Sequence, residues 1–576
     1  MSTLHNGLLK AGFLWVDSQD LPWLARKEAK FGGGYRKKYH TAKGDFEVTI
    51  IVTSPDGSKL PTAYVTYIPD QLRDKAIPHI SPFRRLCYAD EDSSDWDPVL
   101  KDQLASAIDR QIARTLHEST SPEEIESAYQ ADFLNYWFSN REAYCFASPE
   151  AEIGSSPLMF QALDVTTSSS GALENELVIF DNIEQRDAWI KLRNSSLSGV
   201  SGDVVIIRVR TGNLAPESWP PRKLSDIFDW LKSADRSAHD TLAAKIIRYF
   251  SKNLTVLLNI ENEGLMAFRV RFNDRIVTIM NSHSGNRKNS TKKRRGPKSS
   301  TLLPVLRGKY AHDAFVRYHI NPIDEASLYL RNRKDPSAGD LKNKRICLIG
   351  CGTIGGYVAE LLVKVGAGKG PLGRLHLYDN DTYSPGNFGR HRLPARYFGW
   401  YKSEALADLL IKDTLGPLNV FAIDSKFLVT SENVKKFDII IDVTGRPPVG
   451  RMLANCTRDI INPPYLIHGF NEGHGRASVV FIDNGQACYG CLKKMDVFSK
   501  LPIDREERYS CGSMYTPYDA NVSVITAGLV QEATLNTLLK KLPWTYAEHI
   551  SDGYKTRERC KLKPYSKCAV NKHDSH

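Results

Sequence analysis

A glycine-rich stretch carries the clearest chemistry in this sequence. Gly350, Gly352 and Gly355 follow an apolar segment at 345–349 and stand at the start of a predicted helix. Glycines in this position let the backbone approach phosphate groups, and the N–H groups at a helix start attract anions. The pattern predicts a nucleotide site, and a tight turn that only packs the helix on the strand is the alternative.

The polar residues beyond this stretch indicate which nucleotide is bound. Asp379 ends the next predicted strand, where a carboxylate can bind the hydroxyl groups of a ribose. Asp381, Asn387, Arg390 and Lys402 follow it. Arginine and lysine beside a triphosphate stabilise the charge that develops in the transition state. An NAD-type oxidoreductase would use the glycines and the first carboxylate but leaves the two cations unexplained.

Four of the ten cysteines suggest a metal site. The chain has no secretion signal, so metal binding or thiol chemistry is expected rather than a disulfide scaffold. Cys488 and Cys491 form a CxxC pair, which suits half of a tetrahedral zinc site, and Cys560 and Cys568 could supply the other half. Two unconnected pairs of thiols remain the alternative.

Two further cysteines lie in polar segments and are candidate nucleophiles. Cys511 stands in a predicted loop before a helix that begins near Asn521, and nearby arginines and the helix start favour the reactive thiolate form. Cys87 precedes Asp90 and Asp92, whose carboxylates could orient or deprotonate an incoming amine. For each cysteine, a structural thiol is the alternative.

From the glycine stretch onward, the sequence resembles the ubiquitin-activating superfamily, in particular its ThiF/MoeB-type adenylating enzymes. Their signature is a glycine loop, then D-x-D, then N-x-x-R and then a lysine, and Asp379, Asp381, Asn387, Arg390 and Lys402 stand in register with it. The resemblance implies that ATP, with Mg²⁺ as counter-ion, adenylates the C-terminal carboxylate of a small protein. It also implies that Asp379 binds the ribose and that Asn387, Arg390 and Lys402 bind the phosphates. The resemblance further implies a homodimer.

Two positions of this family bear on the metal and the acyl group. The family usually has a D-x-T-D pattern that holds magnesium, whereas this chain has Asp442 and then Gly445 in place of the second acid. Either Asp442 takes over that role or the end of the strand has a different geometry. Cys511 lies where the family's crossover loop should be, so the resemblance implies that it takes the carrier from AMP as a thioester.

The segment around Cys87 resembles a ubiquitin-conjugating domain. Such domains run from a helix through a strand meander to an HP-containing segment, the catalytic cysteine, a W-x-P-like segment and a second helix. Here these segments are at 78–79, at Cys87 and at 96–98. The usual His-Pro-Asn is absent, so the resemblance implies that His79 or a backbone N–H stabilises the oxyanion.

Three blocks are expected to position these residues. Block 1–150 is α+β, with strands on either side of a turn at 55–57 and a helix whose apolar residues recur four apart. These residues are Leu100, Leu104, Ile108, Ile112 and Leu116. Block 151–335 is an α/β or α+β middle domain whose predicted strands include 266–272 and 275–280. Block 336–576 alternates strands and helices, which predicts a doubly wound α/β sheet.

Composition narrows the class of protein. Hydrophobic residues make up 41% and charged residues 25% of the 576, which is ordinary for a globular protein. No apolar run is long enough for a membrane span, and we expect a cytoplasmic protein. Much of the net charge of +11 comes from the run 287–298, which holds seven Lys or Arg. This run lacks aromatic residues for stacking on bases, so a solvated loop is expected rather than a nucleic-acid site.

A conjugating-like domain ahead of a ThiF-type domain resembles the fused activating–conjugating proteins of bacterial CBASS antiphage operons. The resemblance implies that the carrier is a cGAS/DncV-like nucleotidyltransferase. Its C-terminus would pass through thioesters on Cys511 and then Cys87 to a lysine or other amine. A sulfur-carrier adenylating enzyme of cofactor biosynthesis shares the nucleotide site but needs no Cys87 domain.

Overall fold

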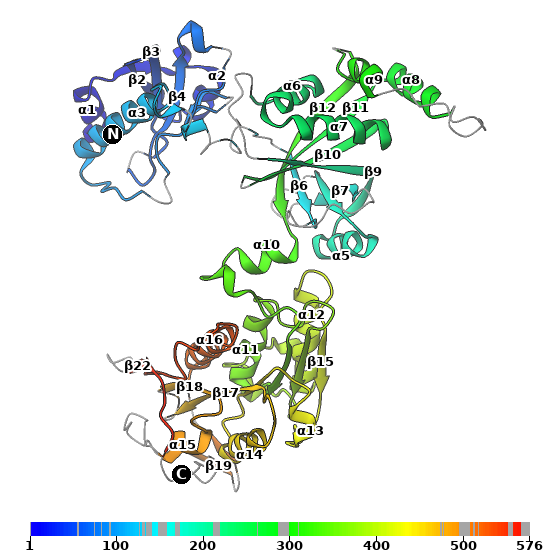
Figure 1. Ribbon diagram of the computed structural model, residues 1–576. Coiled ribbons are helices and arrows are strands. Elements are labelled where there is room, and N and C mark those ends of the chain that lie inside the picture. The colour runs from blue at the N-terminus through cyan, green and yellow to red at the C-terminus, as the bar shows by residue number, and fades with distance from the viewer. Residues whose placement is uncertain are drawn as a thin grey trace. The chain divides into compact units, whose positions relative to one another are not determined.

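The computed structural model forms two compact units, Met1–Ile323 and Asp324–His576 (Figure 1). The described residues are 2–54, 57–73, 75–81, 83–90, 94–125, 127–129, 133, 137, 141–147, 158–166, 173–210, 219–261, 263–285, 299–308, 310–472, 475, 477–494, 507–510, 513–515, 518–550 and 557–565. None of the helices among them has both the length and the apolar character that crossing a bilayer requires.

The first unit begins with a five-stranded antiparallel sheet in the order β1-β2-β3-β4-β5. Its elements are α1 (Ser2–Lys10), β1 (Leu14–Asp17), α2 (Trp23–Glu28), β2 (Gly33–Thr41), β3 (Gly44–Ile51), β4 (Thr62–Tyr67), β5 (Arg85–Leu86) and α3 (Lys101–Glu118). The strands predicted on either side of the 55–57 turn are β3 and β4, which pair. The predicted helix is α3, and all its predicted core positions are buried except Leu100, the N-cap, which is 45% exposed.

A closed barrel in the order β10-β11-β12-β6-β8-β7-β9 forms the rest of this unit. Its strands are β6 (Glu142–Cys145), β7 (Leu158–Thr166), β8 (Leu173–Phe180), β9 (Ser196–Val209), β10 (Asn253–Ile260), β11 (Gly264–Phe272) and β12 (His312–Pro322). Its helices are α5 (Ile183–Arg193), α6 (Leu224–Ala234), α7 (Arg236–Arg248), α8 (Asp274–Gly285) and α9 (Ser299–Leu306). Strand β6 falls within the expected block 1–150 but pairs with barrel strands. The three-domain division at 150 and 335 therefore stays a prediction.

The prediction of a strand at 275–280 is wrong, because these residues lie in α8. Asn273 caps this helix: its Oδ1 accepts the N–H of Ile276, and its backbone oxygen accepts the N–H of Val277. Ile276 and Met280, one helical turn apart, are buried in the barrel-side core, the hydrophobic cluster that the barrel strands form with α6 and α7. A short apolar run fits either a strand or a helix, and here the capping residue decides between them.

The second unit contains an eight-stranded sheet in the order β15-β14-β13-β16-β17-β18-β21-β22, as the predicted doubly wound fold requires (Figure 1). Its strands are β13 (Arg345–Ile349), β14 (Arg374–Tyr378), β15 (Val420–Ile423), β16 (Ile439–Asp442), β17 (Tyr465–Glu472), β18 (Ala477–Asp483), β21 (Tyr546–Ile550) and β22 (Arg557–Cys560). The main helices are α11 (Thr353–Val363), α12 (Lys402–Asp413), α14 (Pro447–Arg458) and α16 (Ala520–Asn536). Strands β13, β14 and β16 are parallel neighbours, so the polar residues at their carboxyl ends meet at one edge.

Candidate active site

The glycine loop between β13 and α11 combines packing with open space. Gly350 has φ +96° and donates its N–H to the Tyr378 carbonyl at 2.8 Å. A Cβ on Gly355 would lie 1.9 Å from the Gly350 oxygen, so close helix–strand packing requires glycine there. A Cβ on Gly352, the N-cap of α11, would meet nothing within 4 Å. Space is therefore open at the helix start, where a phosphate would lie.

Asp379 joins this loop to the next strand end. Its Oδ2 accepts the N–H of Cys351 at 2.7 Å, and its Oδ1 accepts the N–H of Asp381 at 2.8 Å. A carboxylate oxygen can accept two hydrogen bonds, so each oxygen keeps capacity for a further donor. The carboxylate is thus fixed beside the glycine loop and can still accept a bond from a ribose hydroxyl.

Lys402 is oriented toward the same carboxylate cluster. It begins α12, and its backbone N–H donates to the Asp381 carbonyl at 2.9 Å. Its Nζ lies 3.3 Å from Asp381 Oδ2, with the lysine side chain 10% exposed and the aspartate side chain 69% exposed. The structure therefore brings Asp379, Asp381 and Lys402 together, as their spacing in the sequence predicts.

Asn387 and Arg390 lie on the following loop, each with a contact of its own. The Asn387 Oδ1 accepts the N–H and hydroxyl of Ser384, which closes a 3₁₀ turn. The Arg390 guanidinium carbon lies 4.6 Å from the centre of the Tyr518 ring, just before α16. This cation–π contact connects the loop to a residue that nothing in the sequence pattern singled out.

His391 fixes the same loop to the glycine loop. Its Nδ1 accepts the N–H of Leu393 at 3.1 Å, so Nε2 carries the proton and donates to the Cys351 carbonyl at 3.0 Å. Burial lowers the pKa of His391 to about 4, and the imidazole is neutral at pH 7. Sequence reasoning missed this positioning residue, because a histidine next to Arg390 carries no signal of burial.

Asp442, at the end of β16, is enclosed by protein groups. Its Oδ1 accepts the N–H and the hydroxyl of Thr444 at 3.1 and 2.7 Å, and its Oδ2 lies 3.2 Å from His468 Nδ1. Asp442 is 4% exposed and His468 is 1% exposed. These contacts favour a positioning role over direct magnesium ligation. Gly445 has φ +64°, a conformation that glycine adopts without strain.

The CxxC pair brings two buried thiols together. The Sγ atoms of Cys488 and Cys491 are buried and 3.7 Å apart, and the Tyr565 N–H donates to Cys491 Sγ at 3.4 Å. Cys560 is exposed at the end of β22. Cys568 lies outside the described residues, among which no group of three or more metal-ligating side chains occurs.

Several other predicted residues also lie outside the described part: Cys511, Asp92 and the basic run 287–298. The strands that flank Cys511, β19 (Glu507–Ser510) and β20 (Ser513–Tyr515), pair with each other. Burial raises the pKa of the Cys347 and Cys351 thiols well above the ordinary value. These two thiols therefore stay protonated and do not compete as nucleophiles.

Cys87 is exposed at the end of β5 and is held by its backbone. Its N–H donates to the His79 carbonyl at 2.8 Å. The turn 77–80 is closed by a backbone hydrogen bond, and the Ser119 hydroxyl donates to the Pro78 carbonyl at 2.8 Å. His79 has φ +62°, which is rare outside glycine. A strained and well-held turn thus supports the exposed cysteine.

Comparisons with known proteins identify the family of each matched part of the chain. The ThiF family model matches residues 326–574, and the model of Prokaryotic E2 family B matches residues 24–146. ATP-dependent ubiquitin transferase-like protein Cap2 of Vibrio cholerae is 36% identical over 98% of this chain and 99% of its own length. The chain belongs to the Cap2 family. The Cap2 protein of Escherichia coli is 35% identical over 96% of this chain and 95% of its own length.

This membership confirms the prediction of a CBASS protein in which a ThiF-type domain is fused to an E2-like domain. A Cap2-family chain of this kind is an ATP-dependent adenylating enzyme and ubiquitin-like transferase that acts on a protein. An oxidoreductase fits neither family match, and a sulfur-carrier enzyme leaves residues 24–146 without a role. Among solved structures, E. coli MccB with ATP is similar at 18% identity and a TM-score of 0.32, over 50% of this chain and 76% of its own.

Proposed function

We propose that this chain joins the C-terminus of a cGAS/DncV-like nucleotidyltransferase to a lysine or other amine, in the cytoplasm, as part of CBASS antiphage defence. One observation carries the proposal: two chemically different sites share this chain. One places fixed carboxylates and the buried Lys402 ammonium beside an open glycine loop, and the other exposes Cys87 on a strained turn. The first arrangement suits adenylation, and the second suits acyl transfer.

In the first step, ATP lies on the glycine loop with its ribose on Asp379. Asn387, Arg390 and Lys402 bind the phosphates, and Arg390 exchanges part of its contact with Tyr518 for them. The carrier's C-terminal carboxylate attacks the α-phosphorus, the bond to the bridging oxygen breaks, and pyrophosphate leaves. Lys402 and Arg390 stabilise the negative charge that develops, and their fixed positions reduce the cost of reorganisation.

Mg²⁺ fits one carboxylate of this site better than the other. Asp381 is exposed and offers oxygen ligands of the kind that Mg²⁺ prefers, whereas the oxygens of Asp442 are occupied by Thr444 and His468. We therefore assign the ion to Asp381 and the nucleotide phosphates, and assign Asp442 to the support of the strand end. The ion would neutralise phosphate charge when bound.

The acyl group then moves through two thioesters. The Cys511 thiolate attacks the acyl carbon of the adenylate, and AMP leaves. The Cys87 thiolate attacks the new thioester and releases Cys511 as its thiolate. The target amine attacks the Cys87 thioester, Asp90 or Asp92 takes the amine proton, and Cys87 leaves. His79 or a backbone N–H stabilises the oxyanion of the last step.

Zinc and a homodimer complete the proposal. Two thiolates on one tetrahedral zinc ion lie roughly 3.8 Å apart, and the Sγ atoms of Cys488 and Cys491 are 3.7 Å apart. Tyr565, which lies between Cys560 and Cys568 in the chain, donates its N–H to Cys491 Sγ, and this contact supports the assignment. We assign these four cysteines to a structural zinc ion, and we assign dimerisation to the ThiF-type domain.

A gel without reductant tests the relay. The full chain is incubated with ATP, magnesium and a purified cGAS/DncV-like nucleotidyltransferase, and the products are run with and without reductant. We expect reductant-sensitive adducts, which Cys511→Ala abolishes completely. Cys87→Ala should leave one adduct, on the activating domain. Cys456→Ala, a half-buried cysteine without an assigned role, is the matched control and should behave as wild type. Adducts that persist in both active-site variants would disprove the relay.

A further inference from the structure

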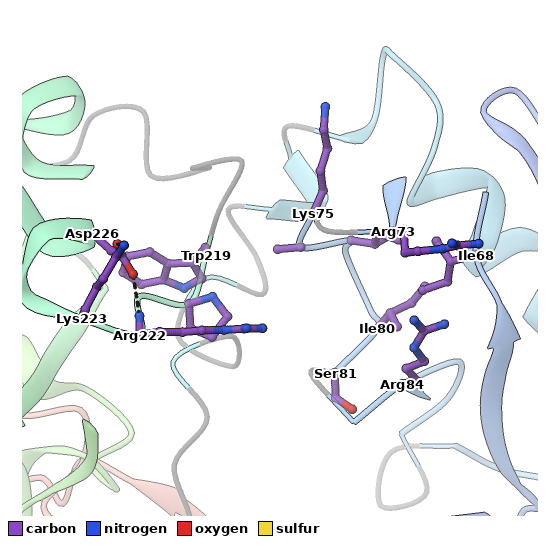
Figure 2. Close-up of a pocket in the computed structure, with 13 residues that line it drawn as sticks. Ile68, Arg73, Lys75, Ile80, Ser81, Arg84, Trp219, Arg222, Lys223 and Asp226 are labelled. Carbon is purple, nitrogen blue, oxygen red and sulfur yellow. Dashed lines mark hydrogen bonds and ion pairs between the residues drawn. The ribbon is translucent and has the colours of Figure 1, made fainter. Parts of the chain in front are cut away.

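The first unit contains a pocket of about 640 Å³ that no step of the relay uses (Figure 2). One wall is the 73–84 segment beside the five-stranded sheet, and the other is the 219–226 segment that leads into α6 of the barrel part. The walls are held together, since Ala76 packs against the barrel-side core and accepts a hydrogen bond from the Tyr129 hydroxyl.

The pocket is lined by five cations and one carboxylate. These are Arg73, Lys75, Arg84, Arg222, Lys223 and Asp226. The carboxylate is already engaged: Asp226 Oδ2 accepts the Arg222 N–H at 2.9 Å, and Oδ1 lies 3.7 Å from Lys223 Nζ. Arg73 is paired with Asp70, whereas among the described residues no carboxylate pairs with the guanidinium of Arg84 or Arg222. Burial and the charge of Arg222 also lower the pKa of nearby Arg317, consistent with an excess of positive charge.

The positive charge comes from side chains and not from backbone N–H groups. In the wall that carries Arg84, the Ser81 N–H donates to Arg85, the Arg84 N–H donates to Ser81, and the Ile80 N–H closes its own turn. The Arg222 N–H is bonded to Asp226. Arginine and lysine side chains bind carboxylates and phosphates alike. Here they lie exposed on two walls and are not joined by free backbone N–H groups, an arrangement that suits several carboxylates spaced along an extended peptide.

This pocket lies next to the backbone that holds Cys87. Ile80, which lines the pocket, forms a bridge with Leu86, the residue before Cys87. The Cys87 N–H donates to His79, the residue before Ile80. Figure 2 shows the Arg222 side chain extending from the barrel wall toward the loop of Ser81 and Arg84. A protein attached to Cys87 through its C-terminus has its preceding residues within reach of this loop.

We propose that the pocket binds an acidic peptide segment of the protein that is being conjugated and so guides its tail to Cys87. The carboxylates of the segment pair with Arg84 and Arg222 from opposite walls. This proposal rests on the proposed function, because it assigns a role to the tail that Cys87 carries. It names the chemistry of that tail as acidic.

A binding assay tests the pocket without ATP or thioester formation. A fluorescein-labelled hexapeptide of alternating glutamate and alanine is titrated with the full chain, and anisotropy is recorded. We expect wild type to bind it at low salt and Arg84→Glu/Arg222→Glu to bind about tenfold or more weakly, because charge-assisted hydrogen bonds are lost. The control Arg110→Glu/Lys232→Glu makes the same charge change on exposed residues outside the pocket and should retain binding.

Each of the following results would overturn the proposal. The first is equal binding by wild type and the pocket variant, and the second is equal binding of the matched glutamine peptide. The third is inorganic triphosphate binding that depends on Arg84 and Arg222 while the acidic peptide does not bind, which would assign the pocket to a phosphate ligand. If circular dichroism shows that the double glutamate variant is misfolded, Arg84→Gln/Arg222→Gln takes its place. This variant should show a smaller loss of peptide binding, and unchanged binding would also contradict the proposal. Absence of thioester adducts in wild type would disprove the relay alone, because peptide binding does not depend on it.

Discussion

At the proposed nucleotide site of the second unit, hydrogen bonds to backbone groups and to other side chains fix the polar side chains in place. Asp379 accepts two backbone N–H groups, the Lys402 ammonium is directed at Asp381, and His391 fixes the adjacent loop. In the first unit, Cys87 is exposed, and the described hydrogen bond that positions it comes from its backbone to His79. One site fixes charges, and the other presents a reactive atom.

This difference follows from the chemistry of the two steps. Adenylation builds negative charge on phosphate, and fixed donors stabilise such charge most when they need no reorganisation. Thioester transfer needs a thiol that a second large protein can approach, so access matters more than enclosure. Variants at the adenylation site should therefore change the rate of adenylation strongly. Variants at the Cys87 site should show which effects come from the backbone of the turn and which come from the side chains.

The largest effect is expected at Lys402. Lys402→Ala removes the buried ammonium that we assign to the phosphates, so ATP–pyrophosphate exchange should fall by about 100-fold or more. Lys435→Ala, an exposed lysine of the same unit, is the control and should leave exchange unchanged. Exchange that survives Lys402→Ala would mean that the cation only stabilises Asp381.

Two glycines of one loop should separate folding from binding. Gly355→Ala places a Cβ 1.9 Å from the Gly350 oxygen, which should destabilise the second unit by about 3 kcal/mol. Gly352→Ala meets no atom within 4 Å, so its unfolding midpoint should stay unchanged while ATP binds more weakly. Denaturant unfolding and ATP titration of both variants measure the two effects. Equal ATP affinity in Gly352→Ala and wild type would contradict phosphate binding at this loop.

The second unit could be predicted in detail because its central parallel strands β13 and β16 are buried apolar runs and its polar residues follow the strands at fixed spacing. Asp379 and Lys402 are found by motif, and Asp381 connects them: its N–H donates to Asp379 Oδ1, and its Oδ2 lies 3.3 Å from Lys402 Nζ. The contact of Arg390 with Tyr518 joins residues far apart in the chain, and no local period encodes it. The enclosure of Asp442 likewise depends on His468 from the neighbouring strand.

The first unit was harder to predict because its important features depend on backbone angles and on packing between distant segments. The positive φ of His79 is invisible in a Pro78-His79 pair, since turns of this kind usually contain glycine or asparagine at that position. The pocket between the 73–84 and 219–226 segments depends on how sheet and barrel pack. The helix α8 was missed because its short apolar run fits the repeat of a helix as well as that of a strand. The Asn273 cap decides for the helix.

Acid should weaken the nucleotide site through His391. Its pKa is about 4 in the folded chain against an ordinary value of 6.5, so protonation favours unfolding. The stabilisation is complete above pH 6.5 and is lost as the pH falls toward 4, by up to about 3 kcal/mol. His391→Gln should flatten this dependence of the second unit's unfolding free energy, whereas the control His549→Gln should preserve it. Parallel pH profiles for wild type and His391→Gln would show that another group causes the acid sensitivity.

The smallest effect is expected at His79, where stability and chemistry can be separated. His79→Gly removes the Cβ from a residue with φ +62°, which should stabilise the first unit by about 1 kcal/mol. His79→Ala keeps the strained backbone and removes the imidazole, so it should not raise the unfolding midpoint. If the imidazole stabilises the oxyanion, both variants slow discharge of the Cys87 thioester to an amine equally. If a backbone N–H serves instead, His79→Ala discharges at the wild-type rate, and any loss in His79→Gly comes from loosening the turn that holds Cys87.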